Sequence, residues 1–180
     1  LKKEKQIDFV IANGDGVTGG FGIGKNHSIY LRKLGVDVIT GGDMTFFKKD
    51  MAEHIEKAYY LLRPANLPPE MPGRGWRHYT VTPPGKSADA STNTDADTKT
   101  AASPDTNGEA ADSGDDGAPA THDSEVRLTV ISLLGQSGFD RVHPSNPFTY
   151  LPELAGRARN ETPYVVVDFH ALTTAEKNTK

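Results

Sequence analysis

Short runs of apolar residues alternate along the chain with longer stretches in which apolar residues recur at three-to-four spacing. The runs are rich in Val, Ile, Leu and Phe and are bounded by Gly, Asn or Asp, which is typical of buried strands. We therefore predict strands over residues 7–13, 36–42, 76–82, 126–135 and 164–170. The amphipathic stretches predict helices over residues 27–35, 48–62 and 151–160.

The order of these elements favours an α/β fold. Strands that alternate with helices are typical of parallel strands in the core of a sheet. Residues 76–82 and 126–135 have no predicted helix between them, and they resemble the two arms of a hairpin. This mixture favours a layered sandwich over a single open sheet of the dinucleotide-binding type.

Residues 83–124 interrupt the pattern. They are rich in Ala, Asp, Thr, Ser, Gly and Pro, and they contain almost no large apolar side chain. Such a composition cannot bury enough surface to offset the entropy lost on ordering. We predict a single domain over residues 1–180, with a disordered acidic insertion at about 83–124. The insertion is either a tolerated surface loop or a segment that binds a partner.

The net charge of −4 is unevenly distributed. Residues 87–124 contain nine acidic residues and one lysine, a net charge of −8 that leaves +4 on the rest of the chain. This excess suits a small anionic ligand and is too weak to predict specific nucleic-acid binding.

Cysteine content and hydropathy limit the compartment and the chemistry. The chain has no cysteine, which excludes disulfides and thiolate–metal sites. No run of about 18 apolar residues is present, so we expect no membrane span. With no visible targeting segment either, we predict a cytoplasmic location. The first residue is Leu1 rather than an initiator Met, so we expect the chain to start partway into a longer protein.

The stretch ANGDGVTGGFGIGKN after the first apolar run contains two patterns of phosphate-binding loops. Gly14, Gly16 and Gly19 form G-x-G-x-x-G, and a Walker A spacing ends at Lys25. A dinucleotide loop turns directly into a helix, whereas helical sequence resumes here only near Asn26. A Walker A loop needs a hydroxyl after its lysine to hold magnesium, and Asn26 supplies none. We attribute both matches to glycine density.

Three ligand-type side chains follow three predicted strands. Asp15 comes after the first strand, Asp43 after the second and His170 at the end of the last, which also contains Asp168. Because ligands gather at the carboxyl ends of strands in α/β sheets, these side chains could meet there. Two carboxylates and an imidazole suit a divalent metal ion. Singly, each aspartate could instead cap a helix or form a turn, and the histidine could be structural.

Four blocks of the sequence resemble the motifs of a known family. They are ANGDGVTGGFG, GVDVITGGDMTFFKKD, RPANLPPEMPGRG and VDFHALTTAEK. In the same order, the family has I-N-G-E-N-A-A-x-G-x-G, G-x-D-x-I-T-x-G-N-H-x-W-D-K-K-E, R-P-A-N-x-P-x-x-x-P-G-x-G and D-F-H-A-E-A-T-S-E-K. The match covers essentially everything except the insertion. The chain is thus similar to the YmdB-like branch of the calcineurin-like metallophosphoesterases.

The resemblance implies a four-layer α-β-β-α sandwich, incomplete in this chain, and a hydrolase. It implies two divalent metal ions, iron or manganese, that hydrolyse phosphodiesters such as 2′,3′-cyclic nucleotides, and it suggests a homo-oligomer. Asp15, Asp43 and His170 would be metal ligands, at the positions of the family's bridging Glu, its Asn ligand and its His ligand. Gly19 and Gly20 would give the substrate phosphate close access to the backbone.

The chain departs from the family at the residues that carry the chemistry. Asp15 is shorter than the family's Glu by one methylene, roughly 1.5 Å, and Gly16 stands where the family has Asn. Met44 occupies the position of the histidine thought to protonate the leaving oxygen, and a thioether cannot transfer a proton. Loss of a general acid typically costs about 10²–10⁴-fold in rate. His27, near the glycines, is a candidate substitute.

Two further family segments are absent from the sequence: a first strand ending in G-D-V-V-G and a later G-T-H-T-H segment. Two hypotheses follow. The chain is part of a metal-dependent phosphodiesterase, or it is a catalytically inactive family member that serves as a binding or scaffold protein.

Overall fold

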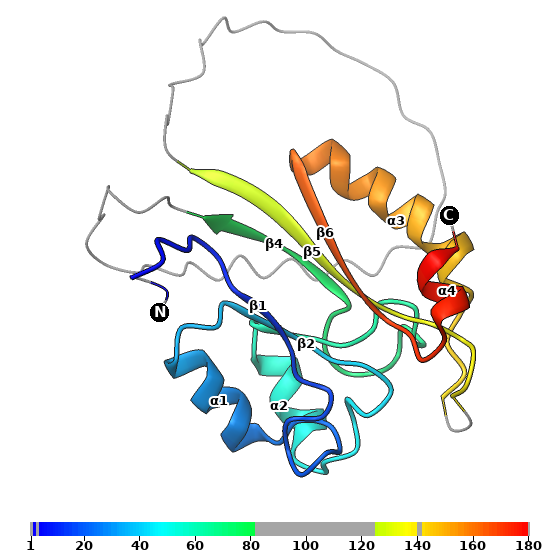
Figure 1. Ribbon diagram of the computed structural model, residues 1–180, viewed down its shortest axis with the longest axis horizontal. Helices are drawn as coiled ribbons and strands as arrows, with labels where there is room; N and C mark the ends of the chain where they lie inside the picture. The colour runs from blue at the N-terminus through cyan, green and yellow to red at the C-terminus, as the bar shows by residue number, and fades with distance from the viewer. Residues whose placement is uncertain (1, 3, 82–124, 140–141, 180) are drawn as a thin grey trace, which may run out of the picture.

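The computed structural model describes residues 2, 4–81, 125–139 and 142–179 (Figure 1), so the predicted insertion at 83–124 lies outside the described residues. Two helices and three strands form the first part of the chain, and three strands and two helices form the second. In chain order the elements are β1 (Ile11–Asn13), α1 (Lys25–Lys33), β2 (Val38–Thr40), α2 (Met51–Lys57), β3 (Leu61–Leu62), β4 (Trp76–Val81), β5 (Val126–Leu134), α3 (Pro147–Glu161), β6 (Tyr164–His170) and α4 (Thr174–Asn178).

The strands form two three-stranded sheets. The first has the order β1-β2-β3 and is wholly parallel, with Ile11 opposite Val38 and Ile39 opposite Leu61. The second has the order β4-β5-β6, in which β4 and β5 are antiparallel and β5 and β6 are parallel. Both the parallel strands and the hairpin-like pair that the sequence predicts are therefore confirmed.

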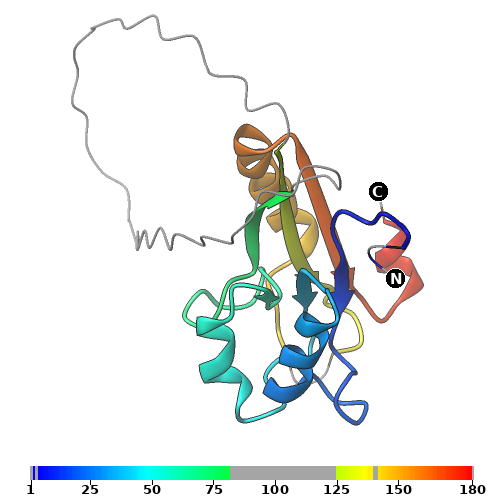
Figure 2. The ribbon, with the colours of Figure 1, turned by 90° about the vertical axis from the view of Figure 1, so that its left-hand side faces the viewer.

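Alternating side chains along the strands join the sheets into layers. Val38 of β2 and Leu62 of β3 pack against Val130 of β5, which places one face of each sheet against the other. The next residue on each strand faces the other way. Ile39 packs against Met51 and Ile55 of α2, and Ile131 packs against Leu154 of α3. The order is thus α1 and α2, first sheet, second sheet, α3 (Figures 1 and 2), which is the predicted α-β-β-α sandwich.

The predicted helix over residues 48–62 is wrong in its last third. Helix α2 ends at Lys57, and Leu61 and Leu62 form β3. Both leucines are buried, one against the helices and the other against the second sheet. An apolar pair of this kind fits a helix or a strand equally well on periodicity alone. Pairing with β2 decides the outcome.

Helix α3 begins earlier than the predicted residue 151. Asn146 caps its N-terminus, where the side-chain Oδ1 accepts a hydrogen bond of 2.9 Å from the backbone N–H of Phe148. Pro147 follows at the first helical position, where its missing N–H has no consequence. Helix α4 has no counterpart in the sequence-based prediction.

The Pro/Gly-rich loop over residues 63–75 crosses from the first sheet to the second. Ala65 N–H donates to the Ser132 carbonyl (2.8 Å), and Ser132 N–H donates to the Gly75 carbonyl (2.9 Å). The loop backbone comes so close to itself that a Cβ on Gly75 would lie 2.2 Å from Cα of Ala65. This close packing fixes the carboxyl ends of β3 and β5 relative to each other.

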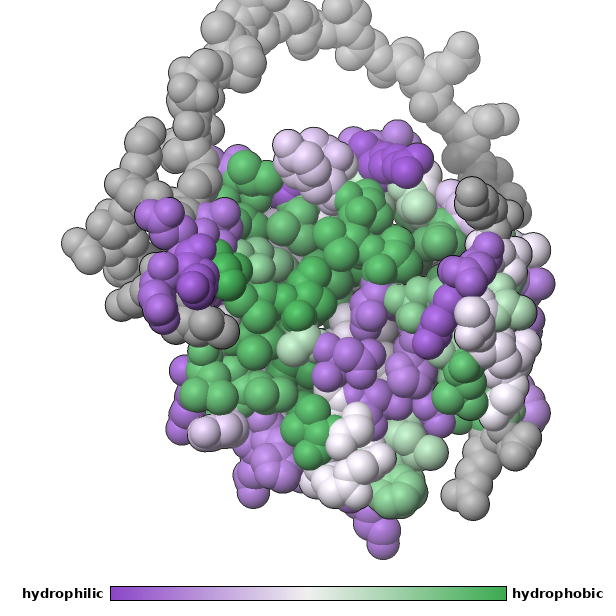
Figure 3. All heavy atoms as spheres, viewed as in Figure 1, coloured by the Kyte–Doolittle hydropathy of each residue, from purple (hydrophilic) through white to green (hydrophobic). Residues whose placement is uncertain are grey.

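Apolar side chains also reach the surface. Figure 3 shows a band of hydrophobic residues across the face seen in Figure 1, and strand β6 carries the exposed Tyr164 and Val166. Strand β6 is an edge of its sheet, so it is a surface through which two copies of the chain could associate. Self-association stays a prediction. Within the described part of the chain, no helix is both long enough and apolar enough to cross a membrane.

Candidate metal centre

Three strand ends bring Asp15, Asp43 and His170 together. Asp15 follows β1 and Asp43 follows β2, while His170 is the last residue of β6. One ligand-type atom from each of the three side chains lies within 4.8 Å of the others. The residues that the sequence singles out at three strand ends are therefore neighbours in space. They come from both sheets, so the cluster lies where the two sheets meet.

The backbone after β2 holds Asp15 in place. Its Oδ1 accepts hydrogen bonds from the N–H groups of Gly42 (2.8 Å) and Met44 (3.2 Å), and only 6% of the residue is exposed. Burial raises the pKa of the Asp15 carboxyl, and the two backbone N–H groups and His170 oppose this rise. A buried carboxylate is costly unless positive charge compensates it. A cation at this point would therefore favour the ionised form.

His170 faces both aspartates. Its Nε2 lies 3.1 Å from Oδ1 of Asp43 and 3.5 Å from Oδ2 of Asp15. The imidazole ring is stacked on Phe139, with ring centroids 6.0 Å apart and planes at 26°. The stacking and the two oxygens together fix the ring so that Nε2 points into the cluster.

Gly42 is required by the close approach of these side chains. A Cβ at this position would lie 2.7 Å from Oδ2 of Asp15 and 2.7 Å from Cδ2 of His170. Both distances are well inside van der Waals contact. Any larger residue at position 42 would displace the side chains that form the cluster.

The donor set fits one divalent metal ion. Two carboxylates and an imidazole are ordinary ligands for manganese, iron or zinc, and the three donor atoms lie within 4.8 Å of one another. Asp168, in the same strand as His170, does not join them. Its Oδ2 accepts hydrogen bonds from Thr40 and Asn13, so this carboxylate ties β6 to the first sheet. Ligands for a second ion are not evident among the described residues.

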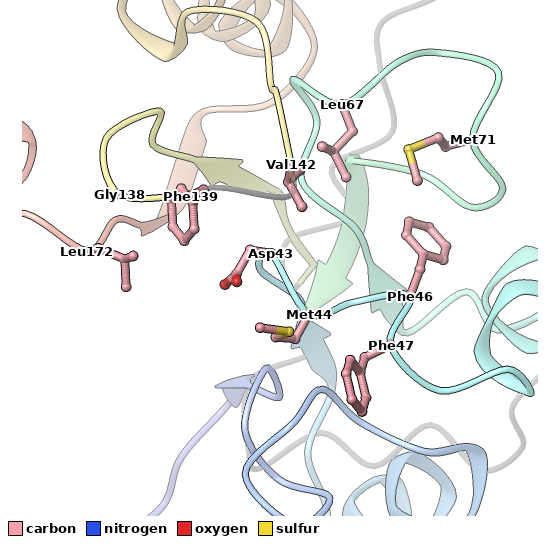
Figure 4. Close-up of a pocket in the computed structure, with 10 residues that line it drawn as sticks. All are labelled: Asp43, Met44, Phe46, Phe47, Leu67, Met71, Gly138, Phe139, Val142 and Leu172. Carbon is pink, nitrogen blue, oxygen red and sulfur yellow. The ribbon is translucent and has the colours of Figure 1, made fainter.

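A pocket of about 550 Å³ opens beside Asp43. Of the described residues that line it, Asp43 is the only charged one, and Met44 lies next to it with its thioether directed into the space (Figure 4). The other lining residues are apolar or glycine and come from four loops: Phe46, Phe47, Leu67, Met71, Gly138, Phe139, Val142 and Leu172. These residues were not predicted from the sequence, because isolated apolar residues in loops carry no periodic signal.

The remaining candidate residues lie in the loop and helix that follow Asp15 and are not members of the cluster. Nδ1 of His27 is 2.8 Å from Oγ1 of Thr18, in the loop that follows β1. Gly19 and Gly20 lie in the same loop with φ of 67° and 82°, in the left-handed region that glycine tolerates. None of the three is among the described residues that line the pocket beside Asp43. A role of these residues in substrate binding stays a prediction.

Comparison with known sequences gives one family. The profile of the YmdB-like protein family matches residues 1–95 and 104–179. The 2′,3′-cyclic-nucleotide 2′-phosphodiesterase of Bacillus subtilis is 28% identical over 177 residues, which are 98% of this chain and 50% of the relative. A putative phosphatase/phosphodiesterase of Mycoplasma pneumoniae is 30% identical over 179 residues, 99% of this chain and 49% of the relative. The chain spans about half the length of the curated relatives it matches.

Solved structures agree with the fold. The crystal structure of a novel phosphatase from Mycoplasma pneumoniae has a TM-score of 0.66 at 27% identity and covers 99% of this chain and 49% of its own. A hypothetical protein from Thermus thermophilus has a TM-score of 0.63 at 22% identity, over 96% of this chain and 50% of its own, and shows the fold alone. The predicted metallophosphoesterase-type sandwich is confirmed.

Proposed function

Because the chain belongs to the YmdB-like protein family, we propose that it forms part of a metal-dependent phosphoesterase that hydrolyses a phosphodiester. The convergence of Asp15, Asp43 and His170 within 4.8 Å is the observation that carries this proposal. The curated relatives named as phosphodiesterases support the reaction class.

The chain's own residues have defined parts in this proposal. Asp15 and Asp43 supply the negative charge that holds a divalent ion, and His170 supplies a neutral nitrogen donor through Nε2. The N–H groups of Gly42 and Met44 fix Asp15, so the ligand geometry exists before the ion binds. A divalent ion bound here would polarise a phosphoryl oxygen and neutralise its charge. By family resemblance the ion is iron or manganese, in a pair whose second member needs ligands outside the described residues.

The apolar pocket supports a substrate with an aromatic or apolar group. It adjoins Asp43, so a phosphoryl group at the cluster would direct its organic substituent toward Phe46, Phe47 or Phe139. Aromatic rings bind planar groups by stacking as well as by excluding water. A nucleobase has this shape, and a cyclic nucleotide is the substrate class in the name of the Bacillus subtilis relative.

Met44 favours a second candidate function. Its side chain lines the pocket beside Asp43, at the position where the family resemblance places a catalytic histidine. The thioether accepts no proton and gives none, so a leaving oxygen would have to take its proton from elsewhere. Such a site could still bind a metal ion and a phosphodiester. The alternative is therefore a binding or scaffold protein that has lost turnover.

We further propose that the described residues belong to one domain. The two sheets share the cluster of Val38, Leu62 and Val130, and the candidate metal centre takes ligands from both. Neither sheet alone could bury these faces.

The metal centre can be tested on the 180-residue chain with Mn²⁺ as the probe. Isothermal titration calorimetry should detect Mn²⁺ binding to the wild type. His170→Ala should weaken it by at least about 10-fold, whereas His143→Ala, which removes an exposed histidine, should not. Absence of Mn²⁺ binding by the wild type would contradict the proposal.

Hydrolysis of bis-p-nitrophenyl phosphate then separates the two candidate functions. Manganese-dependent turnover that is lost in His170→Ala would establish the phosphoesterase. Manganese binding without turnover would favour the binding protein.

A further inference from the structure

Arg63, the first residue of the RPAN motif, is a buried cation that the proposed centre does not use. Only 6% of the residue is exposed. One guanidinium nitrogen, Nη1, donates a 2.8 Å hydrogen bond to the Pro64 carbonyl, while Nε is buried and has no partner among the described residues. Burial lowers the pKa of the Arg63 guanidinium, and the nearby Tyr150 opposes this change.

No carboxylate of the described residues lies within 4.0 Å of the Arg63 guanidinium. A buried charge without a counterion is costly, and proteins rarely retain one unless something compensates it. An arginine also has five N–H donors, of which a single carbonyl satisfies one. Within the described part of the chain, Arg63 therefore has no anionic partner.

Arg63 forms part of the wall of a pocket of about 340 Å³. Arg74, which is exposed, lines the same pocket, as do the aromatic side chains of Trp76 and Tyr150. This pocket shares no lining residue with the pocket beside Asp43. The loop over residues 63–75 contributes to both, with Leu67 and Met71 in one and Arg63 and Arg74 in the other.

The charges around this pocket are mostly positive. Nε2 of His78 is 2.8 Å from Oε2 of Glu161, so these two groups form a pair of their own. The guanidinium of Arg77 lies over the Tyr59 ring, 5.8 Å from its centroid. Arg63 and Arg74 remain as cations that no carboxylate of the described residues balances within 4.0 Å.

We propose that this pocket is a second ligand site, separate from the candidate metal centre, and that it binds a phosphate group through Arg63 and Arg74. Guanidinium groups match the oxygens of a phosphate in paired hydrogen bonds, and two of them suit its double charge better than the single charge of a carboxylate. Trp76 and Tyr150 would lie alongside an aromatic group attached to that phosphate. The ligand class is thus a phosphate monoester, and free phosphate offers the same anionic group.

The test is a titration of the chain with inorganic phosphate in the presence of a chelator, followed by calorimetry or by chemical shifts of the Trp76 indole. The wild type should bind phosphate in the millimolar range, and Arg63→Met and Arg74→Met should each weaken binding by about 10-fold or more. Arg159→Met, at an exposed arginine near the end of α3, should bind as the wild type does. His170→Ala should also bind as the wild type does, which separates this site from the metal centre.

Arg74→Met keeps the proposal falsifiable if Arg63→Met does not fold, because Arg74 is exposed. A wild type that does not bind phosphate would overturn the proposal. The proposal would also be overturned if both arginine variants bound phosphate as well as the wild type does. The same holds if His170→Ala were the only variant that lost phosphate binding. Tighter binding of adenosine monophosphate than of phosphate would support the proposal that Trp76 and Tyr150 contact an aromatic group of the ligand. Equal affinity would contradict that contact and would leave free phosphate as the ligand.

Discussion

Nε2 of His170 lies 3.1 Å from Oδ1 of Asp43, although 127 positions separate the two residues in the sequence. Asp43 follows a strand of the first sheet, and His170 ends a strand of the second. The candidate metal centre therefore depends on how the two sheets are packed. Substitutions beside the ligands should change activity and metal affinity, whereas substitutions in the loops and helices around them should change mainly the free energy of unfolding.

Met44→His should introduce phosphodiesterase activity or increase it. The change places an imidazole beside Asp43, on the wall of the apolar pocket, while the backbone N–H of residue 44 continues to hold Asp15. A general acid typically contributes about 10²–10⁴-fold in rate, so an increase of about 100-fold in kcat for bis-p-nitrophenyl phosphate is expected. Met71→His adds an imidazole to another part of the wall of the same pocket (Figure 4) and serves as the control. Equal rates in the two variants would contradict a role for position 44 in proton transfer.

Gly42→Ala should weaken both the fold and the metal centre. The added Cβ would lie 2.7 Å from Oδ2 of Asp15 and 2.7 Å from Cδ2 of His170, so both side chains must move away from it. We expect a loss of about 1–3 kcal/mol in the free energy of unfolding and about 10-fold weaker Mn²⁺ binding. Urea denaturation and calorimetry measure the two effects.

Gly156 provides the matched control for this change. It lies in α3, and a Cβ there would meet nothing within 4 Å. Gly156→Ala should raise stability by about 0.5–1 kcal/mol, since alanine is the better helix former. If Gly42→Ala left the Mn²⁺ affinity and the free energy of unfolding unchanged, the predicted clash of a Cβ with Asp15 and His170 would be contradicted.

Asn66→Ala should destabilise the protein. The buried side chain donates 2.7 Å hydrogen bonds to the carbonyls of Leu134 and Ser145, and its Oδ1 accepts one of 3.0 Å from the Leu134 N–H. Truncation leaves these backbone groups without partners, so we expect a loss of about 2–4 kcal/mol in the free energy of unfolding. Asn160→Ala, at an exposed position in α3, should change it by less than about 0.5 kcal/mol. Equal midpoints in urea would mean that water replaces the lost contacts.

Acidification should weaken the contact between α1 and α2 through His54. Its Nε2 lies 3.0 Å from Oγ of Ser28 and 3.2 Å from Oη of Tyr60. Burial and the positive charge of Lys25 lower the pKa of His54, and the carboxylate of Asp50 only partly opposes them. The unfolded chain then binds a proton more readily than the folded one. The free energy of unfolding should therefore fall as the pH drops from about 6.5 toward the lower folded pKa.

The His54→Gln variant tests this pH dependence, because glutamine does not titrate. Urea midpoints measured at about pH 7.5 and about pH 5.5 should differ less in the variant than in the wild type. The same difference in both proteins would assign the pH dependence to other groups.

The sequence by itself determined most of the strands and the α/β class, whereas the order of the four layers was implied only by the family resemblance. Five apolar runs became strands, and the antiparallel pair on either side of residues 83–124 was predicted from the lack of a helix between its arms. It also identified Asp15, Asp43 and His170, because strand ends in an α/β fold converge. Local spacing is sufficient for such conclusions, since the side-chain period of a strand and the position just after it are properties of the chain alone.

Only the tertiary structure decided which neighbours each polar group has. Asp168 and His170 lie two positions apart on one strand, yet Asp168 bonds to Thr40 and Asn13 while His170 faces the two aspartates. Leu61 and Leu62 form a strand because β2 lies beside them. Arg63 is buried, with no counterion among the described residues, because the loop that carries it crosses between two sheets. Burial and partners depend on contacts between distant segments, and those contacts are set by packing rather than by local sequence.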